Sequence, residues 1–300
     1  MSDGKTLWLY DRLQKKRVAE QIFERQQMEF FYGHPVGNLI EKLALSHPWC
    51  SKLYGYLRSD PHKAHAQINN FLNTYTIDTS EIRKEIHEFK SFQEFFTREL
   101  KPEARPMPTD PSLLISPADA RLLVFDLRQD RLIPIKGQSY RLLELLGNRS
   151  LAQQFSHGLA CVFRLAPVDY HRFGYIDDGH HGPHVRLGHR LHSVHPWSLR
   201  SGRSVFTENI REYTVLHTRH FGAVIHMDVG ALLVGRMVQH FYQGGSFARG
   251  QEKGYFELGG STTILLFEAN RVIIDSDIRE ASQQGIESLV KYRSAIGRRL

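Results

Sequence analysis

The chain has 300 residues, of which 41% are hydrophobic and 24% are charged, an ordinary balance for a globular protein that can bury a sizeable core. Its net charge of +7 favours an anionic partner, either a nucleic acid or an acidic membrane surface. The two cysteines, Cys50 and Cys161, are far apart and in no CxxC pair, which argues against a disulfide scaffold or a zinc-cysteine site.

Two features bear on contact with a membrane. No apolar run reaches about 18 residues, so a transmembrane helix is excluded. The N-terminal residues Met1 to Thr6 are polar and lack the apolar core of a signal peptide. Any contact with a membrane is therefore expected to be peripheral.

Residues 1–100 are predicted to be helical. The segments 17–31 and 36–45 space their apolar residues as amphipathic helices do, the second more regularly than the first. Further along, Ser91-Phe-Gln-Glu94 has the spacing of a capping box. These helices either pack on the core or lie on a bilayer surface with their aromatic side chains at the acyl boundary, and the sequence leaves both open.

The character of the chain changes after residue 100. Four prolines between Lys101 and Ser112 predict a linker, and residues 113–300 are predicted to form a β-rich domain whose one expected helix spans 139–146. The fold class is therefore α+β, with N-terminal amphipathic helices followed by a β sandwich or partly closed barrel. The predicted strands are 122–125, 132–135, 159–165, 204–206, 213–216, 223–227, 231–234, 262–267 and 272–274.

Two polar residues adjoin predicted strands and are candidates for chemistry. Asp119, in Ser116-Pro-Ala-Asp119, could orient a histidine and stabilise its charged form. His171, in Asp169-Tyr-His-Arg172, could act as a base or an acid just past a strand end. Taken alone, each is better explained by a structural role, as a turn carboxylate and as a histidine bonded to a backbone carbonyl.

A glycine-rich segment suggests a phosphate-binding loop and a histidine-rich segment suggests a metal site, but the residue spacing supports neither. The segment Gly254 to Ser261 has neither the Walker nor the GxGxxG pattern, but a Gly-Ser step leaves a carbonyl unshielded from a neighbouring hydroxyl. Six histidines without interleaved acidic or cysteine ligands fit no compact zinc pattern, so we predict no metal site and expect solvated loop and hairpin residues. They are His180, His181, His184, His189, His192 and His195.

Several segments, in order and spacing, resemble phosphatidylserine decarboxylase proenzymes over roughly residues 85 to 275. The upstream match runs from Ser91 to Pro102 and includes Arg105-Pro106. The other matching blocks are Ser116-Pro-Ala-Asp119, Ala166-Pro-Val-Asp-Tyr-His-Arg-Phe173, His192-Ser-Val-His-Pro196, Val229-Gly-Ala-Leu-Leu-Val-Gly235, Gly250-Gln-Glu-Lys-Gly-Tyr-Phe256 and Leu258-Gly-Gly-Ser-Thr262.

The resemblance implies a self-cleaving, pyruvoyl-dependent lyase of phospholipid biosynthesis. Cleavage between Gly260 and Ser261 would give a β chain of residues 1–260 and an α chain of residues 261–300, with Ser261 converted into the covalent pyruvoyl cofactor. The reaction would be decarboxylation of phosphatidylserine to phosphatidylethanolamine. The resemblance assigns Asp119 and Ser261 to the self-cleavage triad and gives His171 a role in decarboxylation or protonation.

The chain departs from the family motif at residue 174. Gly174 stands where the motif has a second histidine, which is the triad base, and glycine cannot accept a proton from Ser261. A milder departure is Ala120, which replaces the usual glycine. Three outcomes stay open: another histidine acts as the base, the chain matures slowly without one, or it stays uncut.

The resemblance also implies partners and a location. We expect phosphatidylserine in anionic membranes as the substrate surface, association of the β and α chains, a homodimer, and peripheral binding at the cytoplasmic face of a bacterial inner membrane. Nucleic-acid binding rests on charge alone, without basic motifs interleaved with aromatic residues, and is not expected. The alternatives are an uncleaved, non-catalytic lipid-binding homologue and a soluble amino-acid decarboxylase of the same fold.

Overall fold

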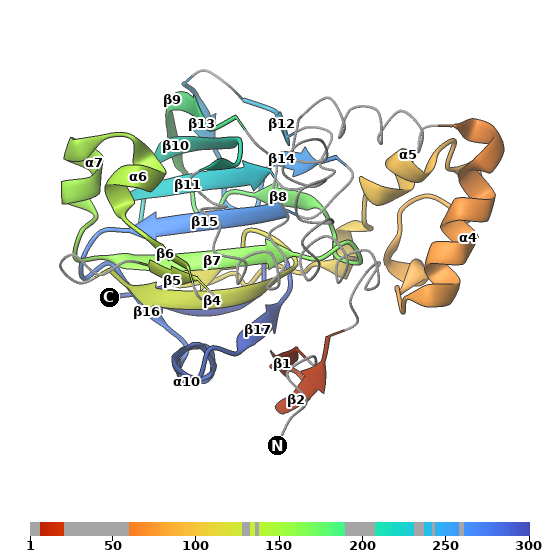
Figure 1. Cartoon of the computed structure of the whole chain (residues 1–300), viewed down its shortest axis with the longest axis horizontal. Coiled ribbons are helices and arrows are strands. Elements are labelled where there is room, and N and C mark those ends of the chain that lie inside the picture. The colour runs from red at the N-terminus through yellow and green to blue at the C-terminus, as the bar shows by residue number, and fades with distance from the viewer. Residues whose placement is uncertain are drawn as a thin grey trace, which may run out of the picture.

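The structure is a computed structural model, in which the protein is mixed α+β and consists mostly of strands (Figure 1). The residues that it describes are 7–20, 60–127, 133–135, 138–189, 208–230, 237–241, 244–257 and 261–300.

A ten-stranded sheet forms the centre of the protein, in the order β13-β9-β10-β11-β15-β7-β4-β17-β1-β2. Neighbouring strands are antiparallel except β1 and β17, which are parallel. The strands are β1 (Trp8–Asp11), β2 (Lys16–Ala19), β4 (Ala120–Asp126), β7 (Leu159–Leu165), β9 (Gly179–Leu187), β10 (Arg211–Thr218), β11 (Ala223–Gly230), β13 (Ser246–Phe247), β15 (Ser261–Phe267) and β17 (Glu287–Val290).

The two central strands, β15 and β7, are buried along their whole lengths and pair from Ser261 with Leu165 to Phe267 with Leu159. β7 is apolar except for Arg164, and β15 is apolar after Thr263, as expected for strands covered on both faces. The predicted strand 159–165 has the bounds of β7, and the predicted strand 262–267 begins one residue inside β15.

Each face of the large sheet is covered by other elements. One face packs on the small sheets β12-β14-β8 and β16-β18-β3 and on α10 (Ser276–Gln283), and its core includes Phe163, Phe173, Phe256 and Leu265. The opposite face packs on α6 (Leu142–Leu146) and α7 (Arg149–Gln154). The small-sheet strands are β3 (Leu113–Ile115), β8 (Arg172–Gly174), β12 (Met237–Gln239), β14 (Glu252–Phe256), β16 (Val272–Ile274) and β18 (Ala295–Arg299), and β5 (Ile133–Ile135) pairs separately with β6 (Gln138–Tyr140).

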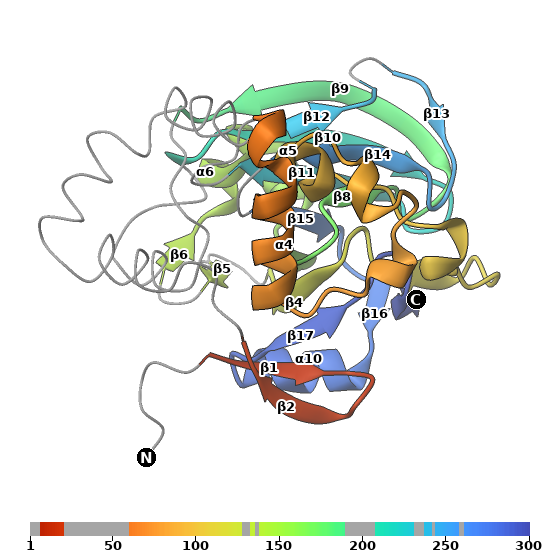
Figure 2. The same ribbon diagram turned by 90° about the vertical axis from the view of Figure 1, so that its right-hand side faces the viewer.

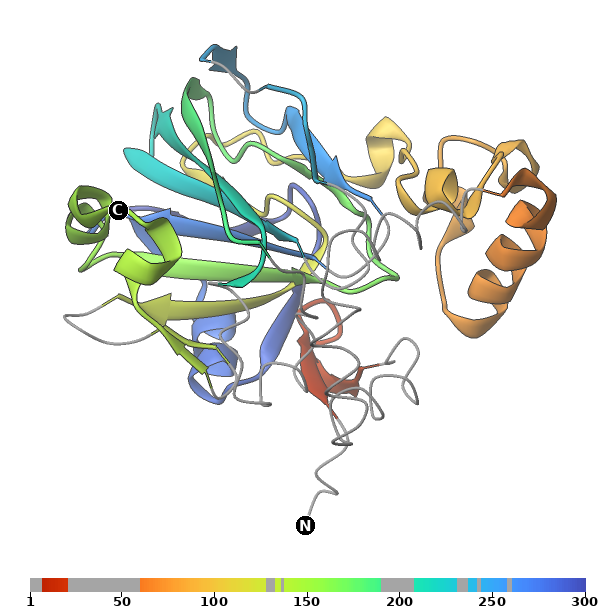
Figure 3. The same cartoon turned by 45° about the horizontal axis from the view of Figure 1, so that its top comes forward.

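A helical lobe projects from one side of the sheet, with α5 (Phe92–Phe96) nearer to the strands than α4 (Ala64–Thr74), as Figures 1 and 3 show. An aromatic cluster holds the lobe together, and Phe71 contacts Phe92 and Phe95 edge-on. Four 3-10 helices complete this part of the chain: η2 (Pro61–Lys63), η3 (Thr79–Glu81), η4 (Ile86–Glu88) and η5 (Pro102–Ala104).

The predicted cap of α5 is confirmed on one side only. Ser91 Oγ accepts a 3.1 Å hydrogen bond from the Glu94 amide, as an N-cap should. The Glu94 carboxylate, however, accepts from the Lys90 amide at 2.8 Å and from the Lys84 ammonium at 2.6 Å. Because Glu94 binds Lys84 and Lys90, it does not form the reciprocal bond to the Ser91 amide that a capping box requires.

Three other predictions need correction. Residues 8–19 form the β1–β2 hairpin, where helix was predicted, because Leu9 is buried in the sheet and β1 pairs with β17 (Figure 2). The sheet runs from β13 to β2 without closing in the described residues, so the alternative of a partly closed barrel is not formed. The helix expected at 139–146 begins at Leu142, after β6.

Several predictions fall on residues that the structure does not describe. The predicted helix at 36–45, most of that at 17–31, and the strands at 204–206 and 231–234 lie outside the described ranges. Among the helices of the described chain, none has the length and apolar character needed to cross a bilayer.

Candidate active site

The strand register brings Ser261 and Asp119 to the same end of the sheet. Ser261 of β15 pairs with Leu165 of β7, and Arg164 of β7 pairs with Arg121 of β4. One residue further in this antiparallel register, Leu165 lies opposite Ala120, the residue that follows Asp119. Because β4 and β15 are two strands apart, their backbones are separated by about 10 Å.

Ser261 begins β15 and is fully buried. Its Oγ has no hydrogen-bond partner within the described part of the chain. Buried hydroxyl groups are normally bonded, so an uncommitted one needs an explanation. Gly260, the other residue of the predicted cleavage site, lies outside the described residues.

Asp119 is buried and held by three basic or amide groups. Arg105 donates to both carboxylate oxygens, at 2.9 and 2.6 Å, the Tyr292 amide donates at 2.6 Å, and the Lys291 ammonium lies at 3.4 Å. Burial acts to raise the pKa of Asp119, but the hydrogen bonds from Arg105 and the nearby positive charges outweigh it and lower the pKa. Asp119 is therefore an ionised carboxylate whose described partners are these groups and not the predicted histidine.

The proline-rich segment does more than link two regions. Arg105 is buried and also pairs with Glu81 of η3 at 2.9 Å, so it joins the helical lobe to Asp119. Composition alone predicted a linker at 101–112, and only the match at Arg105-Pro106 pointed to a fixed position for this arginine.

His171 lies in the loop between β7 and β8 and is fully buried. Its Nδ1 is 3.0 Å from the carbonyl of Asp169, and its ring lies 4.0 Å from the ring of Phe96 in α5. A carbonyl accepts only from a protonated nitrogen, so in the neutral ring Nδ1 carries the proton and Nε2 is the basic atom. His171 is thus oriented by the backbone and by the helical lobe.

A buried ionic network fixes the loop that carries His171. The Asp169 carboxylate accepts from the Arg121 guanidinium and from the Ala166 amide, and the Arg98 guanidinium contacts the Asp169 carbonyl at 3.3 Å. Burial lowers the pKa of Arg98 to about 10, which leaves its charge intact at neutral pH. The same network continues to Glu20, Arg164 and Glu287.

The space beside Gly174 is filled by Tyr292. A Cβ atom at residue 174 would lie 2.3 Å from the Tyr292 hydroxyl and 2.6 Å from the Gln251 carbonyl oxygen, both closer than van der Waals contact permits. The Tyr292 hydroxyl donates to the Gly250 carbonyl at 2.8 Å. Burial raises the pKa of Tyr292, so its phenol keeps its proton and is a poor base. Tyr292 therefore occupies the space that a histidine side chain at residue 174 would need.

A second buried charge centre, which we call the Asp228 network, lies beside β15 and was not predicted from the sequence. Its carboxylate accepts from Lys253 at 2.8 Å, Gln239 at 2.9 Å, Thr263 at 2.9 Å and His226 at 3.1 Å. The charge of Lys253 and the hydrogen bonds from Lys253 and His226 outweigh burial and hold the pKa of Asp228 well below its usual range. Lys253 belongs to a block matched above, but no local pattern pointed to Asp228 as its partner.

The expectation of solvated loop and hairpin histidines is confirmed for His180 and His189, which are exposed, and is wrong for His181, which is buried. His180, His181 and His184 lie on β9, where His181 is buried and His184 pairs with Glu212 at 3.1 Å. His192 and His195 lie outside the described residues. In the described ranges, no three His, Cys, Asp or Glu side chains are grouped to hold a metal ion.

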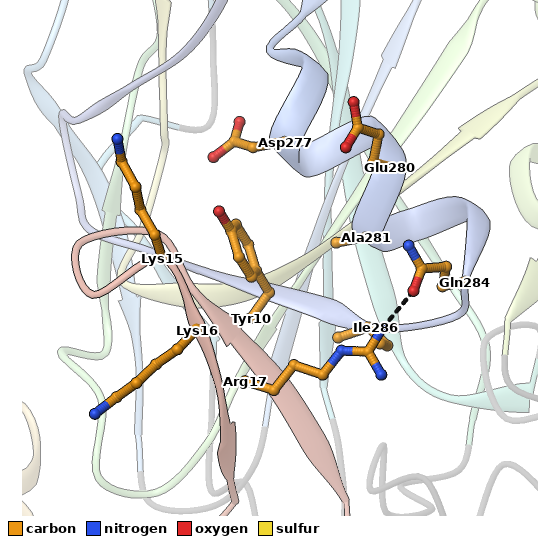
Figure 4. A pocket seen from close by; sticks show the side chains of 9 residues that line it. All are labelled: Tyr10, Lys15, Lys16, Arg17, Asp277, Glu280, Ala281, Gln284 and Ile286. Atoms are coloured by element: carbon orange, nitrogen blue, oxygen red, sulfur yellow. Dashed lines mark hydrogen bonds between the residues drawn. The ribbon is translucent and has the colours of Figure 1, made fainter.

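A pocket of about 260 Å³ lies between the β1–β2 hairpin and α10, and it holds none of the predicted site residues. Figure 4 shows lysine and arginine side chains on its hairpin side and carboxylates on its helix side. Arg17 crosses toward the helix and bonds Gln284 at 2.5 Å. The mixed charge gives this pocket no clear preference for an anion.

Comparisons with known proteins agree with the sequence resemblance. The family described as phosphatidylserine decarboxylase matches residues 92–298. The phosphatidylserine decarboxylase proenzyme of Clostridium novyi (strain NT) is 39% identical over 293 residues, which cover 97% of this chain and 99% of the relative. That of Clostridium beijerinckii (strain ATCC 51743 / NCIMB 8052) is 40% identical over 291 residues, which cover 96% and 98%.

A third relative, the phosphatidylserine decarboxylase proenzyme of Clostridium botulinum (strain Hall / ATCC 3502 / NCTC 13319 / Type A), is 39% identical over 96% of this chain and 98% of the relative. The chain therefore belongs to the phosphatidylserine decarboxylase family, a family of carboxy-lyases of phospholipid biosynthesis that are made as proenzymes.

Proposed function

We propose that this chain cleaves itself between Gly260 and Ser261 and then decarboxylates phosphatidylserine to phosphatidylethanolamine. The observation that carries the proposal is the buried Ser261 hydroxyl, which begins β15 and has no hydrogen-bond partner in the described residues. Family membership supports the same reaction.

The self-cleavage needs no co-reactant except water. Ser261 Oγ attacks the Gly260 carbonyl carbon, the C–N bond breaks, and the amide nitrogen takes a proton to become an amine. Loss of the Ser261 α-proton then breaks the Cβ–O bond, which releases Gly260 as a carboxylate and leaves dehydroalanine at residue 261. Addition of water and loss of ammonia leave a pyruvoyl group on that residue.

The residues present fit such a group at position 261. The position is dry, at the end of a central strand, and its uncommitted oxygen is the atom that the conversion consumes. When formed, a pyruvoyl group supplies an electron-withdrawing carbonyl that stabilises negative charge at the carbon losing carbon dioxide. His171, with its basic Nε2, is the candidate for moving the proton, and Asp119 supplies a fixed negative charge at the same sheet end.

We propose that the β1–β2 hairpin contributes to contact with anionic membranes. Leu13 at its turn is 87% exposed, and Lys15, Lys16 and Arg17 follow it after Gln14. Basic residues near an anionic surface each contribute about 1 kcal/mol to binding. Flotation with phosphatidylserine vesicles tests this role: changing Lys15 and Lys16 to Glu should weaken binding, while unchanged binding would contradict it.

A second candidate is an uncleaved lipid-binding protein, which the Gly174–Tyr292 arrangement favours. Position 174 has no side chain to act as a base, and the phenol that replaces it holds its proton. Loss of a positioned general base typically costs about 10²–10⁴ in rate. On this reading the same fold would bind lipid as one intact chain.

Intact mass under denaturing conditions distinguishes the two candidates. Self-cleavage predicts two species, residues 1–260 and residues 261–300, the smaller with a blocked N-terminus, whereas Ser261→Ala stays at 34.7 kDa. Release of carbon dioxide should then be faster from phosphatidylserine vesicles than from free amino acids. A wild-type preparation with only the intact mass would contradict the decarboxylase proposal and support the second candidate.

A further inference from the structure

The Asp228 network joins the two strands that flank the predicted cleavage site. Thr263 lies two residues after Ser261 on β15 and points to the same face, and Lys253 lies on β14, before the segment 258–260. Both bind the Asp228 carboxylate, Thr263 at 2.9 Å and Lys253 at 2.8 Å. One carboxylate on β11 therefore holds the chain on both sides of that segment.

The network is closed by groups from inside the core. Gln239 of β12 donates to Asp228 and accepts from Lys253 at 2.6 Å, and the Lys253 ammonium lies 5.3 Å from the ring centre of Phe173. Asp228 and His226 are fully buried, and Lys253 is nearly so. A buried ion pair is a costly way to stabilise a fold, because apolar residues of similar volume serve as well or better. The Asp228 network is therefore better explained by the positioning of β14 and β15 than by a contribution to the stability of the fold.

His226 is not placed to be the missing base for Ser261. It stands opposite Leu265, four residues along β15 from Ser261, a separation of about 13 Å. Its Nε2 donates to Asp228, which lies between them, so its basic Nδ1 is turned away. The contribution of this network must come from holding the backbone and not from proton transfer to Ser261.

We infer that Asp228 is a positioning residue for the reaction at Ser261, acting through Thr263 on one side of the cleavage segment and Lys253 on the other. The inference rests on the proposed self-cleavage. By fixing β14 and β15 through one acceptor, it holds the Ser261 hydroxyl at a constant place relative to the preceding carbonyl before the bond breaks. A displacement of about 1 Å at such a site costs on the order of a hundredfold in rate.

Thr263→Val tests the inference because valine keeps the shape and removes only the hydroxyl that binds Asp228. We expect the 261–300 fragment to form on the order of ten- to a hundredfold more slowly, measured by denaturing intact mass at intervals after synthesis. Thr263→Ser, which restores the hydroxyl, should regain the wild-type rate. The matched control is Ser288→Ala on β17, three strands from β15, since the buried Ser288 Oγ also has no partner in the described residues.

Hydrogen exchange of the full-length chain decides the point even if the wild-type protein stays uncut. Thr263→Val should speed exchange in both 252–256 and 262–267, because both strands depend on the same carboxylate, while Ser288→Ala should leave both unchanged. Unchanged exchange in β14, or Thr263→Val cleavage at the wild-type rate, would overturn the inference. An uncut wild-type chain would contradict the proposed self-cleavage, and the exchange rates of β14 and β15 would then test whether the Asp228 network fixes both strands.

Discussion

Asp119 and Asp228 are both buried carboxylates near the Ser261 end of the sheet, but they are held by different kinds of partner. Asp119 is bound by side chains that reach in from outside the large sheet, including Lys291, whose side chain is 58% exposed. Asp228 is bound by buried side chains of β11, β12, β14 and β15. Asp119 is therefore held by residues of the connecting segments, whereas Asp228 is held by residues of the strands themselves and is suited to fix their geometry.

The largest expected effect is that of Asp228→Ala. It leaves the Lys253 ammonium buried without its carboxylate, which should lower the free energy of unfolding by about 3–5 kcal/mol. Asp119→Ala should lower it by about 1.5–3 kcal/mol, because Arg105 keeps Glu81 as a partner. Denaturant unfolding of both variants checks the comparison, and equal losses would show that the two carboxylates are held alike.

The next effect concerns the Asp119 side, at Gly174. Gly174→His should lower the free energy of unfolding by about 1–3 kcal/mol by overpacking against Tyr292, and it should not by itself restore fast cleavage. Combining it with Tyr292→Ala should recover part of that stability and speed cleavage. Thermal unfolding and intact mass of the two single variants and the pair measure this coupling, and additive effects would contradict it.

A smaller effect is the pH at which the Asp228 network and Asp119 each lose their contribution to stability. Burial lowers the pKa of His226, although the charge of Asp228 partly opposes this, with Lys253 and His181 nearby. His226 therefore takes up a proton near pH 6.5 in the unfolded chain but stays neutral in the folded chain. Its contribution to the free energy of unfolding is lost as pH falls from about 7 to 5. Asp119 has a lowered pKa too, and its contribution is lost only as pH falls below about 3.8.

His226→Gln should thus flatten the dependence of unfolding on pH between 7 and 5, by at most about 1.4 kcal/mol per pH unit. The dependence below pH 4 should change little. Chemical denaturation of the variant and the wild type across this range provides the measurement. A slope that is the same in both proteins between pH 7 and 5 would show that His226 takes up its proton in the folded chain.

The sequence predicted the parts of the fold that depend on local pattern. The apolar runs at 159–165 and 262–267 gave β7 and β15, and the matched blocks led to Asp119, His171 and Ser261. The β1–β2 hairpin was missed because its pairing with β17 joins segments almost a chain length apart. Tyr292 beside Gly174 and Thr263 beside Asp228 were missed for the same reason, since no local spacing reports a contact across the sheet.

The central place of β15 has a consequence for maturation. Its described ladders to β11 and β7 run from Ser261 to Phe267, which stands opposite Val224 and Leu159, so cleavage and loss of the Ser261 nitrogen affect only the first rung and leave those from Thr262 onward in place. The new chain end would already lie inside the finished sheet, with a neighbour on each side. Maturation would then change covalent bonds in a protein that already has its final shape, and no refolding of the backbone would be needed.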